Sequence, residues 1–255
     1  MPASAPRDLV YPPVIMAAKA MFRALDMRIT VEGAHHVPRT GGAVLASNHI
    51  SYLDFIFCGF GAQQSRRLVR FMAKTEVYGN PLVKGLMRGM HHIEVDRRAG
   101  TGSYDTAVAA LRLGEIVGVF PEGTISRSFT IKPLKTGAAR MATVAQVPLL
   151  PMAVWGGQRI WTKGRKRTLT RGVPISILIG APLQIGAQDS PASITTRLKE
   201  AMSGLLVRAQ EQYPDQPAGP ADSWWLPAHL GGTAPTLEEA AALDAQARRQ
   251  AAGTA

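Results

Sequence analysis

The chain has 255 residues, of which 46% are hydrophobic and 18% charged, and it carries a formal net charge of +11. This balance excludes an intrinsically disordered chain, and the length allows one domain with a sizeable core. The excess of positive charge favours an anionic partner: nucleic acid, an acidic membrane surface or an anionic substrate.

The cysteine content and the N-terminal pattern limit the compartment. The only cysteine, Cys58, excludes an internal disulfide framework and suits a reducing compartment. It lies in an apolar run, so we expect a buried, inert thiol and not a nucleophile. Residues 1–13 lack a basic segment followed by an apolar one, so we expect no signal peptide.

Residues 12–26 predict an amphipathic helix. Most of its positions are apolar, and Lys19 and Arg23 form a narrow basic stripe. The segment is too short and too charged to span a bilayer. It can lie in a membrane interface with its basic stripe toward the lipid headgroups, or it can pack on the core as an ordinary first helix. Both alternatives stay open on the residues alone.

An alternating strand is predicted at residues 28–33, and a loop follows it. The loop contains the neighbouring His35 and His36, which have no third ligand at a useful spacing. We therefore expect no metal site in this chain.

Polar side chains that can take part in acid–base chemistry lie between two apolar runs. These runs are a predicted buried strand at 43–46 and the next element at 55–58. On one continuous helix His49 and Asp54 would lie about 140° apart. They can meet if His49 lies in the turn and Asp54 opens the following helix and reaches back. The carboxylate would then accept one imidazole N–H and leave the other ring nitrogen free as a base. The alternative is a simple capping box between Ser51 and Asp54.

Two basic residues follow predicted strands further along the chain. Lys74 ends a strand at 70–74, and Arg97 lies near the end of a strand at 92–98. Ligands of an α/β sheet gather at the carboxyl ends of its strands, so we expect both residues in one site. The helical pattern at 81–90 between them has an apolar face, which suits either a second membrane-facing element or a surface helix.

A third strand-end loop follows the buried strand predicted at 116–120. Pro121 ends that strand, and Glu122, Gly123 and Thr124 come next. Glycine allows close approach of the backbone to a ligand. A Pro-Glu-Gly triplet on its own is most often an ordinary turn.

The remaining elements complete an alternating pattern. Helices are predicted at 101–113, at 136–142 and from Ser190 to Tyr213, and strands at 147–154, with Pro148 and Pro151 at its ends or edge, and at 174–180. Alternating strands and helices predict an α/β fold, a single domain with a mixed, largely parallel sheet flanked by helices.

We expect three segments. Residues 1–27 contain the amphipathic helix, 28–213 form the main domain, and 214–255 form a peripheral tail with a capping box at its final helix. The basic stretch 159–171 contains Trp161 and resembles an interfacial hairpin, which suits anionic lipid, an acidic carrier protein or plain solvent. Trp224 and Trp225 suit either an interfacial anchor or packing on the core.

Four sequence blocks together resemble the glycerolipid acyltransferase family, which includes the lysophosphatidic acid acyltransferases. They are Asn48-His49 with Asp54, Val95-Asp96-Arg97, Phe120-Pro121-Glu122-Gly123-Thr124, and Val147-Pro148-Leu149-Leu150-Pro151. All four occur in the family's order, and the resemblance covers roughly residues 30 to 185. One block alone would be weak, but four in order are strong.

The resemblance implies an acyltransferase that moves a fatty acyl group from a thioester to a lysophospholipid hydroxyl. His49 would act as general base, and Asp54 would orient it. Glu122 and Gly123, with Thr124 in the same block, would shape the acceptor site, and a backbone N–H there would serve the oxyanion. No cofactor is expected, because acyl-coenzyme A or an acyl carrier protein brings the activated acyl group.

Lys74, Arg97 and Arg127 are the candidate ligands for the acceptor phosphate. The family often has an arginine directly after the Phe-Pro-Glu-Gly-Thr block, whereas this chain has Ile125 and places Arg127 two positions further on. This departure keeps glycerol 3-phosphate, another lysolipid or a glycolipid open as acceptor.

A membrane-associated N-terminal segment is common in the family, so the resemblance implies that residues 1–27 are a membrane-associating segment. The expected location is the cytoplasmic face of the cell membrane, with peripheral attachment to anionic lipid. No nucleic-acid-reading motif is evident and aromatic residues are only 6%, so we expect no nucleic acid partner. A basic membrane-binding or nucleic-acid-binding protein without catalysis is the competing class.

Overall fold

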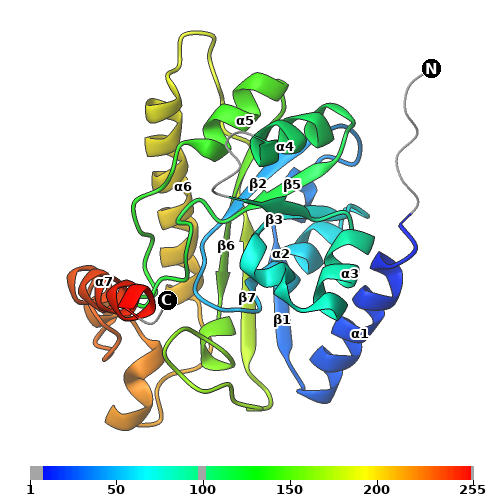
Figure 1. Cartoon of the computed structure of the whole chain (residues 1–255). Helices are drawn as coiled ribbons and strands as arrows, with labels where there is room; N and C mark the ends of the chain where they lie inside the picture. The colour runs from blue at the N-terminus through cyan, green and yellow to red at the C-terminus, as the bar shows by residue number, and fades with distance from the viewer. Residues whose placement is uncertain (1–7, 97–101, 254–255) are drawn as a thin grey trace.

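The computed structural model describes residues 8–96 and 102–253, with side chains as far as residue 250. Within these ranges one seven-stranded sheet has the order β1-β7-β6-β2-β5-β3-β4. Neighbouring strands are parallel except for β6 and β7, which are antiparallel. The expected α/β domain with a mixed, largely parallel sheet is confirmed (Figure 1).

The elements lie close to their expected places. The strands are β1 (Arg28–Glu32), β2 (Ala43–Ser47), β3 (Val69–Lys74), β4 (Ile93–Val95), β5 (Ile116–Val119), β6 (Leu149–Trp155) and β7 (Pro174–Ile179). The α-helices are α1 (Tyr11–Ala24), α2 (Asp54–Gln63), α3 (Pro81–Gly89), α4 (Gly102–Arg112), α5 (Gly137–Ala145), α6 (Pro191–Glu211) and α7 (Leu237–Gly253). Short 3-10 helices are η1 (Ala34–His36), η2 (Thr75–Gly79), η3 (Gly157–Arg159), η4 (Pro220–Trp225) and η5 (Ala228–Leu230).

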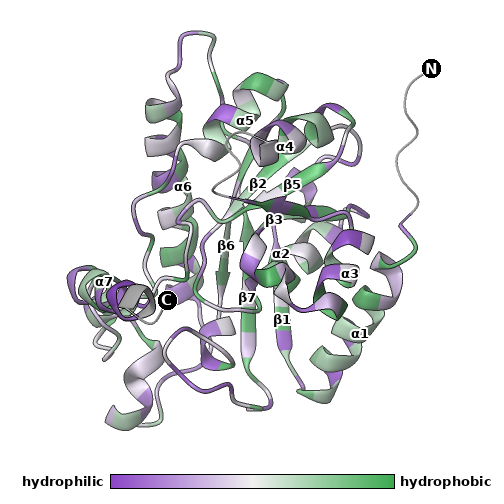
Figure 2. Ribbon diagram, viewed as in Figure 1, coloured by the Kyte–Doolittle hydropathy of each residue, from purple (hydrophilic) through white to green (hydrophobic). Residues whose placement is uncertain are grey.

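Helices cover both faces of the sheet. Every residue of β2, β5, β6 and β7 is buried, as expected for strands with apolar neighbours above and below. Side chains alternate along β2: Val44 and Ala46 pack with α4, α5 and α6, whereas Ala43 and Leu45 pack with α1 and α2. Figure 2 colours these central strands as hydrophobic.

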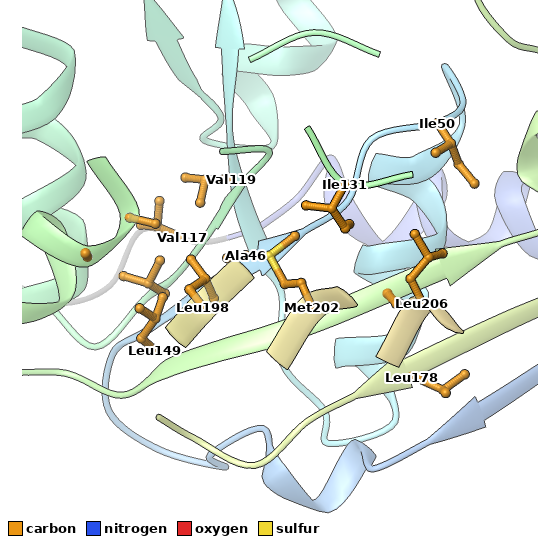
Figure 3. Close-up of a cluster of buried hydrophobic side chains, with 14 of the residues drawn as sticks. Ala46, Ile50, Val117, Val119, Ile131, Leu149, Leu178, Leu198, Met202 and Leu206 are labelled. Carbon is orange, nitrogen blue, oxygen red and sulfur yellow. The ribbon is translucent and has the colours of Figure 1, made fainter. Parts of the chain in front are cut away.

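The largest hydrophobic cluster among the described residues lies under α6. Figure 3 shows Leu198 and Met202 of this helix near the strand residues Ala46, Val117 and Leu149, and Leu206 further along the helix on the side of Leu178. Ser190 begins the helix as predicted, because its side chain accepts the Ser193 N–H at 3.1 Å.

One expected placement is wrong, that of Pro151. It lies inside β6, which has a neighbouring strand on each side. Its carbonyl accepts a hydrogen bond from the Gly180 N–H at 2.8 Å, one residue beyond the end of β7. The N–H and C=O of one strand residue point to the same side, so the missing N–H faces the place where β7 has already ended. Proline therefore costs no bond of the ladder there.

The helix α1 packs on the sheet by one face. Phe22 stacks on Phe57 with 5.7 Å between the ring centroids, and the Tyr11 hydroxyl donates to the Val69 carbonyl at 2.6 Å. Arg70 is buried and pairs with Asp8, just before the helix, at 2.7 Å. Among the described helices none combines the length and the apolar character that a bilayer crossing needs.

The thiol of Cys58 on α2 is fully buried, as expected from the sequence. Burial raises the pKa of this thiol well above its ordinary value, so it stays protonated at neutral pH.

The chain after α6 returns to the core. Trp225 is 1% exposed and packs against Tyr213, with 5.6 Å between the rings, while Trp224 is only partly buried. The capping box at the start of α7 is confirmed, because Thr236 and Glu239 exchange side-chain and backbone hydrogen bonds. The division at residues 27 and 213 stays a prediction.

We predict that Trp225→Ala destabilises the whole fold. Loss of a fully buried tryptophan costs about 3–5 kcal/mol in the free energy of unfolding, which urea titration followed by circular dichroism measures. Trp224→Ala is the matched control, and its cost should be about 1 kcal/mol or less. Equal effects of the two substitutions would contradict the packing described here.

Candidate active site

The turn after β2 is attached to the centre of the sheet by Asn48. Its side-chain N–H donates to the Val154 carbonyl at 2.9 Å, and its side-chain oxygen accepts the Val154 N–H at 2.7 Å. Asn48 thus replaces a residue of the ladder between β2 and β6 and is itself fully buried. The next residue, His49, is therefore held at the carboxyl end of a central strand.

His49 and Asp54 meet as the sequence predicts. The ring Nδ1 of His49 lies 2.9 Å from Oδ2 of Asp54, the first residue of α2. The same Oδ2 accepts the backbone N–H groups of Ile50 at 2.7 Å and Ser51 at 2.8 Å. The full capping box does not form, because the Ser51 hydroxyl accepts from Leu53 N–H and donates to the Trp161 carbonyl.

The hydrogen bonds determine which imidazole nitrogen acts as base. Oδ2 of Asp54 accepts from three N–H groups, so Nδ1 of His49 carries the proton and Nε2 is left as the basic nitrogen. Burial raises the pKa of the Asp54 carboxyl, while the hydrogen bond and charge of His49 act in the opposite direction. The His49 ring stacks on Phe120, with 4.2 Å between the centroids, which fixes the plane of the imidazole.

Glu122 holds the same turn from a second strand. One oxygen accepts the backbone N–H of His49 at 2.8 Å, and the other accepts the backbone N–H of Lys132 at 3.0 Å. Burial raises the pKa of this carboxyl to about 7, although both N–H groups and the Lys132 charge act to lower it. Glu122 thus connects the loop after β5 to the turn that contains His49, and its side chain does not line the cavity.

The loop between β6 and β7 holds the turn from the opposite side. The Thr162 hydroxyl donates to the Ile50 carbonyl at 2.6 Å, and the Tyr52 N–H donates to the Trp161 carbonyl at 3.1 Å. Gly157 lies against Ser51, where an added Cβ would come within 3.1 Å of the Ser51 Cβ. The expected hairpin is thus the long connection of the antiparallel pair β6–β7.

A cavity of about 1180 Å³ opens beside His49. Its wall is mostly apolar and comes from several elements, including Val14, Ile15 and Met21 of α1, Leu86 and Met87 of α3, and Phe71 of β3. These residues place a large apolar space next to His49. The arrangement suits a substrate with an alkyl chain and a polar reacting end.

The structure gathers most of the predicted site residues. His49, Lys74, Gly123 and Thr124 line this cavity, and Asp54 and Glu122 lie buried behind His49. Arg97 lies outside the described residues. The Gly123 N–H donates to the Phe120 carbonyl at 2.9 Å, so this backbone N–H is taken up by the turn and is not available to an oxyanion.

Arg127 has a different neighbour from the one expected. Its Nε lies 3.1 Å from a carboxylate oxygen of Asp244 on α7, and the cavity wall does not include it. Lys132 and Lys163 pair with the same carboxylate.

Sequence reasoning missed Phe120, Lys132 and Asp244 as parts of the site. The sequence places Phe120 only in a block and at the end of a predicted strand, whereas the structure stacks it on His49. No local pattern points to Asp244, which is 117 residues from Arg127 along the chain.

Comparison with known proteins adds independent information. A family model described as Acyltransferase matches residues 28–155. The 1-acyl-sn-glycerol-3-phosphate acyltransferase of Bacillus subtilis (strain 168) is 32% identical over 200 residues, 74% of this chain and 94% of that protein. The 1-acyl-sn-glycerol-3-phosphate acyltransferase alpha of Homo sapiens is 29% identical over 69% of this chain and 62% of its own length.

A solved structure shares the fold. The crystal structure of the 1-acyl-sn-glycerophosphate (LPA) acyltransferase PlsC from Thermotoga maritima superposes with a TM-score of 0.68 at 24% identity. The match covers 80% of this chain and 81% of that chain.

We predict a pH signature for the buried Glu122 carboxyl. Its pKa rises from an ordinary 4.5 to about 7 on folding, so protonation favours the folded state. This contribution to stability is complete below the unfolded pKa and is lost as pH rises through the folded one. Between those pH values the wild type should lose about 2–3 kcal/mol more stability than Glu122→Gln, which cannot titrate there.

Urea titrations at half-unit pH steps measure this difference. Glu238→Gln, at an exposed position of α7, is the matched control and should follow the wild type. If the stability curves of the wild type and Glu122→Gln run parallel from acid to neutral pH, the raised pKa is excluded.

Proposed function

Because the chain belongs to the acyltransferase family, we propose that it transfers a fatty acyl group from a thioester to the free hydroxyl of 1-acylglycerol 3-phosphate, forming phosphatidic acid. The observation that carries this proposal is the His49–Asp54 pair beside a large apolar cavity. The printed names of the similar proteins support the acceptor.

The reaction needs one base and no covalent intermediate. The acceptor oxygen attacks the thioester carbonyl carbon while Nε2 of His49 takes the hydroxyl proton. Asp54 stabilises the imidazolium through Nδ1, as in a serine triad whose serine is replaced by the substrate. The C–S bond then breaks, and the leaving thiolate takes the proton from the imidazolium. General-base action of this kind contributes about 10²–10⁴-fold to the rate.

The polar part of the cavity suits an anionic headgroup. Lys74, Lys135 and Lys163 line the cavity, as do Thr124, His49 and Gly123. Their charges complement a phosphate on the acceptor or on coenzyme A. A carrier-protein donor would use the same pantetheine thioester, and the basic loop at 159–171 would face its acidic surface.

Attachment to anionic lipid on the cytoplasmic face of the cell membrane is part of the proposal. The cavity wall is built from α1 and α3, and these helices expose apolar side chains, with Met16 71% and Leu82 83% exposed. Lys19 and Arg23 on α1 are exposed as well. An exposed apolar surface on the helices that line the cavity would let an acyl chain pass from lipid to protein without crossing water.

We predict that His49→Ala lowers acceptor-dependent thiol release by about 10²–10⁴-fold. The assay uses palmitoyl-coenzyme A with and without lysophosphatidic acid, and the unfolding curve of the variant must match that of the wild type. His35→Ala, an exposed histidine of the loop before β2, is the matched control. A folded His49→Ala protein with most of its activity would exclude His49 as the base.

The same assay tests the acceptor and the reaction class. Release with glycerol 3-phosphate, another lysolipid or a glycolipid, and none with lysophosphatidic acid, would move the acceptor to that compound. No release with any acceptor or donor would favour a membrane-binding protein without catalysis.

We predict that Leu82→Asp weakens binding to vesicles of phosphatidylglycerol by about ten- to a hundredfold, since burial of a leucine contributes about 1.5–3 kcal/mol. Co-sedimentation measures the bound fraction. Leu113→Asp, at a position 59% exposed just after α4, is the control and should bind as the wild type does. Equal binding of the Leu82→Asp variant and the wild type would remove α3 from the membrane surface.

A further inference from the structure

The helix α7 brings one carboxylate to three cations at the edge of the site. Asp244 lies 2.7 Å from Nζ of Lys163, 3.1 Å from Nε of Arg127 and 3.9 Å from Nζ of Lys132. Burial acts to raise the pKa of Asp244, but the hydrogen bonds from Lys163 and Arg127 outweigh it and the pKa lies below the usual range. The carboxylate is therefore ionised at neutral pH.

The three cations come from two separate loops, which follow different strands of the sheet. Arg127 and Lys132 lie between β5 and α5, and Lys163 lies between β6 and β7. The Arg127 side chain crosses to the second loop over Gly164, where an added Cβ would overlap its Nη1. Asp244 thus joins the two loops that hold the His49 turn, one through Glu122 and the other through Thr162.

The cluster reaches the cavity through Thr124 and Lys163, both of which line it. Nζ of Lys132 donates to Oγ1 of Thr124 at 2.6 Å, so the Thr124 hydroxyl proton is left to donate elsewhere. Because Thr124 lines the cavity, an anionic oxygen of a bound substrate is suited to accept this hydroxyl proton in a hydrogen bond. One carboxylate against three cations leaves a net charge of about +2 for such a ligand.

We propose that Asp244 is a positioning residue for phosphate recognition. It holds Lys132 and Lys163 so that the Thr124 hydroxyl and the Lys163 ammonium meet a phosphate group of the substrate. The inference rests on the proposed function, and the phosphate is either that of the acceptor or one of those of coenzyme A. Without the carboxylate the three cations repel one another, and Lys132 and Lys163 leave these positions.

The experiment compares Asp244→Asn, Asp244→Glu and the exposed control Glu238→Gln of the same helix. KM and kcat are measured separately for lysophosphatidic acid and for palmitoyl-coenzyme A. Asp244→Asn should raise KM for one of them about tenfold, as expected for the loss of a charge-assisted hydrogen bond, with a smaller change in kcat. The substrate whose KM rises identifies the phosphate.

Two further comparisons distinguish a role of Asp244 in positioning the substrate-binding lysines from a role in fold stability alone. Asp244→Glu should recover most of the affinity, because it restores the charge. The effects of Lys163→Ala and Asp244→Asn on KM should be strongly non-additive in the double variant, since both act through one ion pair. The proposal is overturned if Asp244→Asn leaves both KM values unchanged or lowers either of them. It is also overturned if Asp244→Asn reduces kcat and thermal stability together and Asp244→Glu restores neither. A lowered KM would mean that Asp244 competes with the substrate.

A binding measurement keeps this result independent of the reaction. Inorganic pyrophosphate should raise the melting temperature of the wild type and of Glu238→Gln, and raise that of Asp244→Asn much less. A wild type that shows this shift but no acyl transfer would refute the proposed function and support the phosphate site. An active wild type with equal shifts in all variants would refute the role of Asp244 alone.

Discussion

One buried carboxylate oxygen organises the site. Oδ2 of Asp54 accepts the imidazole Nδ1–H of His49 and two consecutive backbone N–H groups, so a single atom fixes both the turn and the ring. The turn folds around the first residue of α2, where the helix N-terminus also favours negative charge. A carboxylate bound only to the backbone N–H groups would not orient the imidazole of His49. A carboxylate bound only to the imidazole would not fix the backbone of the turn. The surrounding strands then hold this unit at the centre of the sheet.

Glu122 places a second buried carboxylate beside the same turn, which is electrostatically costly. Its pKa of about 7 reports that cost, with burial as the main cause and the Asp54 charge adding to it. This carboxylate fixes the position of the turn, because Glu122 joins the loop after β5 to the peptide N–H of His49. His49 is thus held by two carboxylates through different groups, the ring and the backbone. Such a site has little freedom to move, which favours a reaction that depends on positioning.

The sequence predicts contacts correctly where the residues are close along the chain or where the sheet topology brings their loops together. His49 and Asp54 are five positions apart, and strand-end loops meet by topology, so Thr124 and Lys74 could be placed together before the fold was known. Pro151 was misplaced because its tolerance depends on where a neighbouring strand ends, which is a property of β7 and not of β6. Asp244 was missed because ion pairs across 117 positions leave no periodic trace. The apolar cavity was not located either, since amphipathic helices such as α1 look the same whether they face lipid, core or ligand.

The burial of Cys58 has a practical chemical consequence. Its sulfur is the only one in the chain that carries a hydrogen, it is inaccessible, and its thiol stays protonated at neutral pH. A disulfide dye that counts free sulfhydryl groups therefore reacts with the native enzyme far more slowly than with an accessible thiol, such as the one that cleavage of a thioester substrate would release. Turnover can be followed continuously by colour without blocking the protein first. The same dye, applied during unfolding, becomes a reporter of the opening of α2, because exposure of this one sulfur requires that helix to leave the sheet.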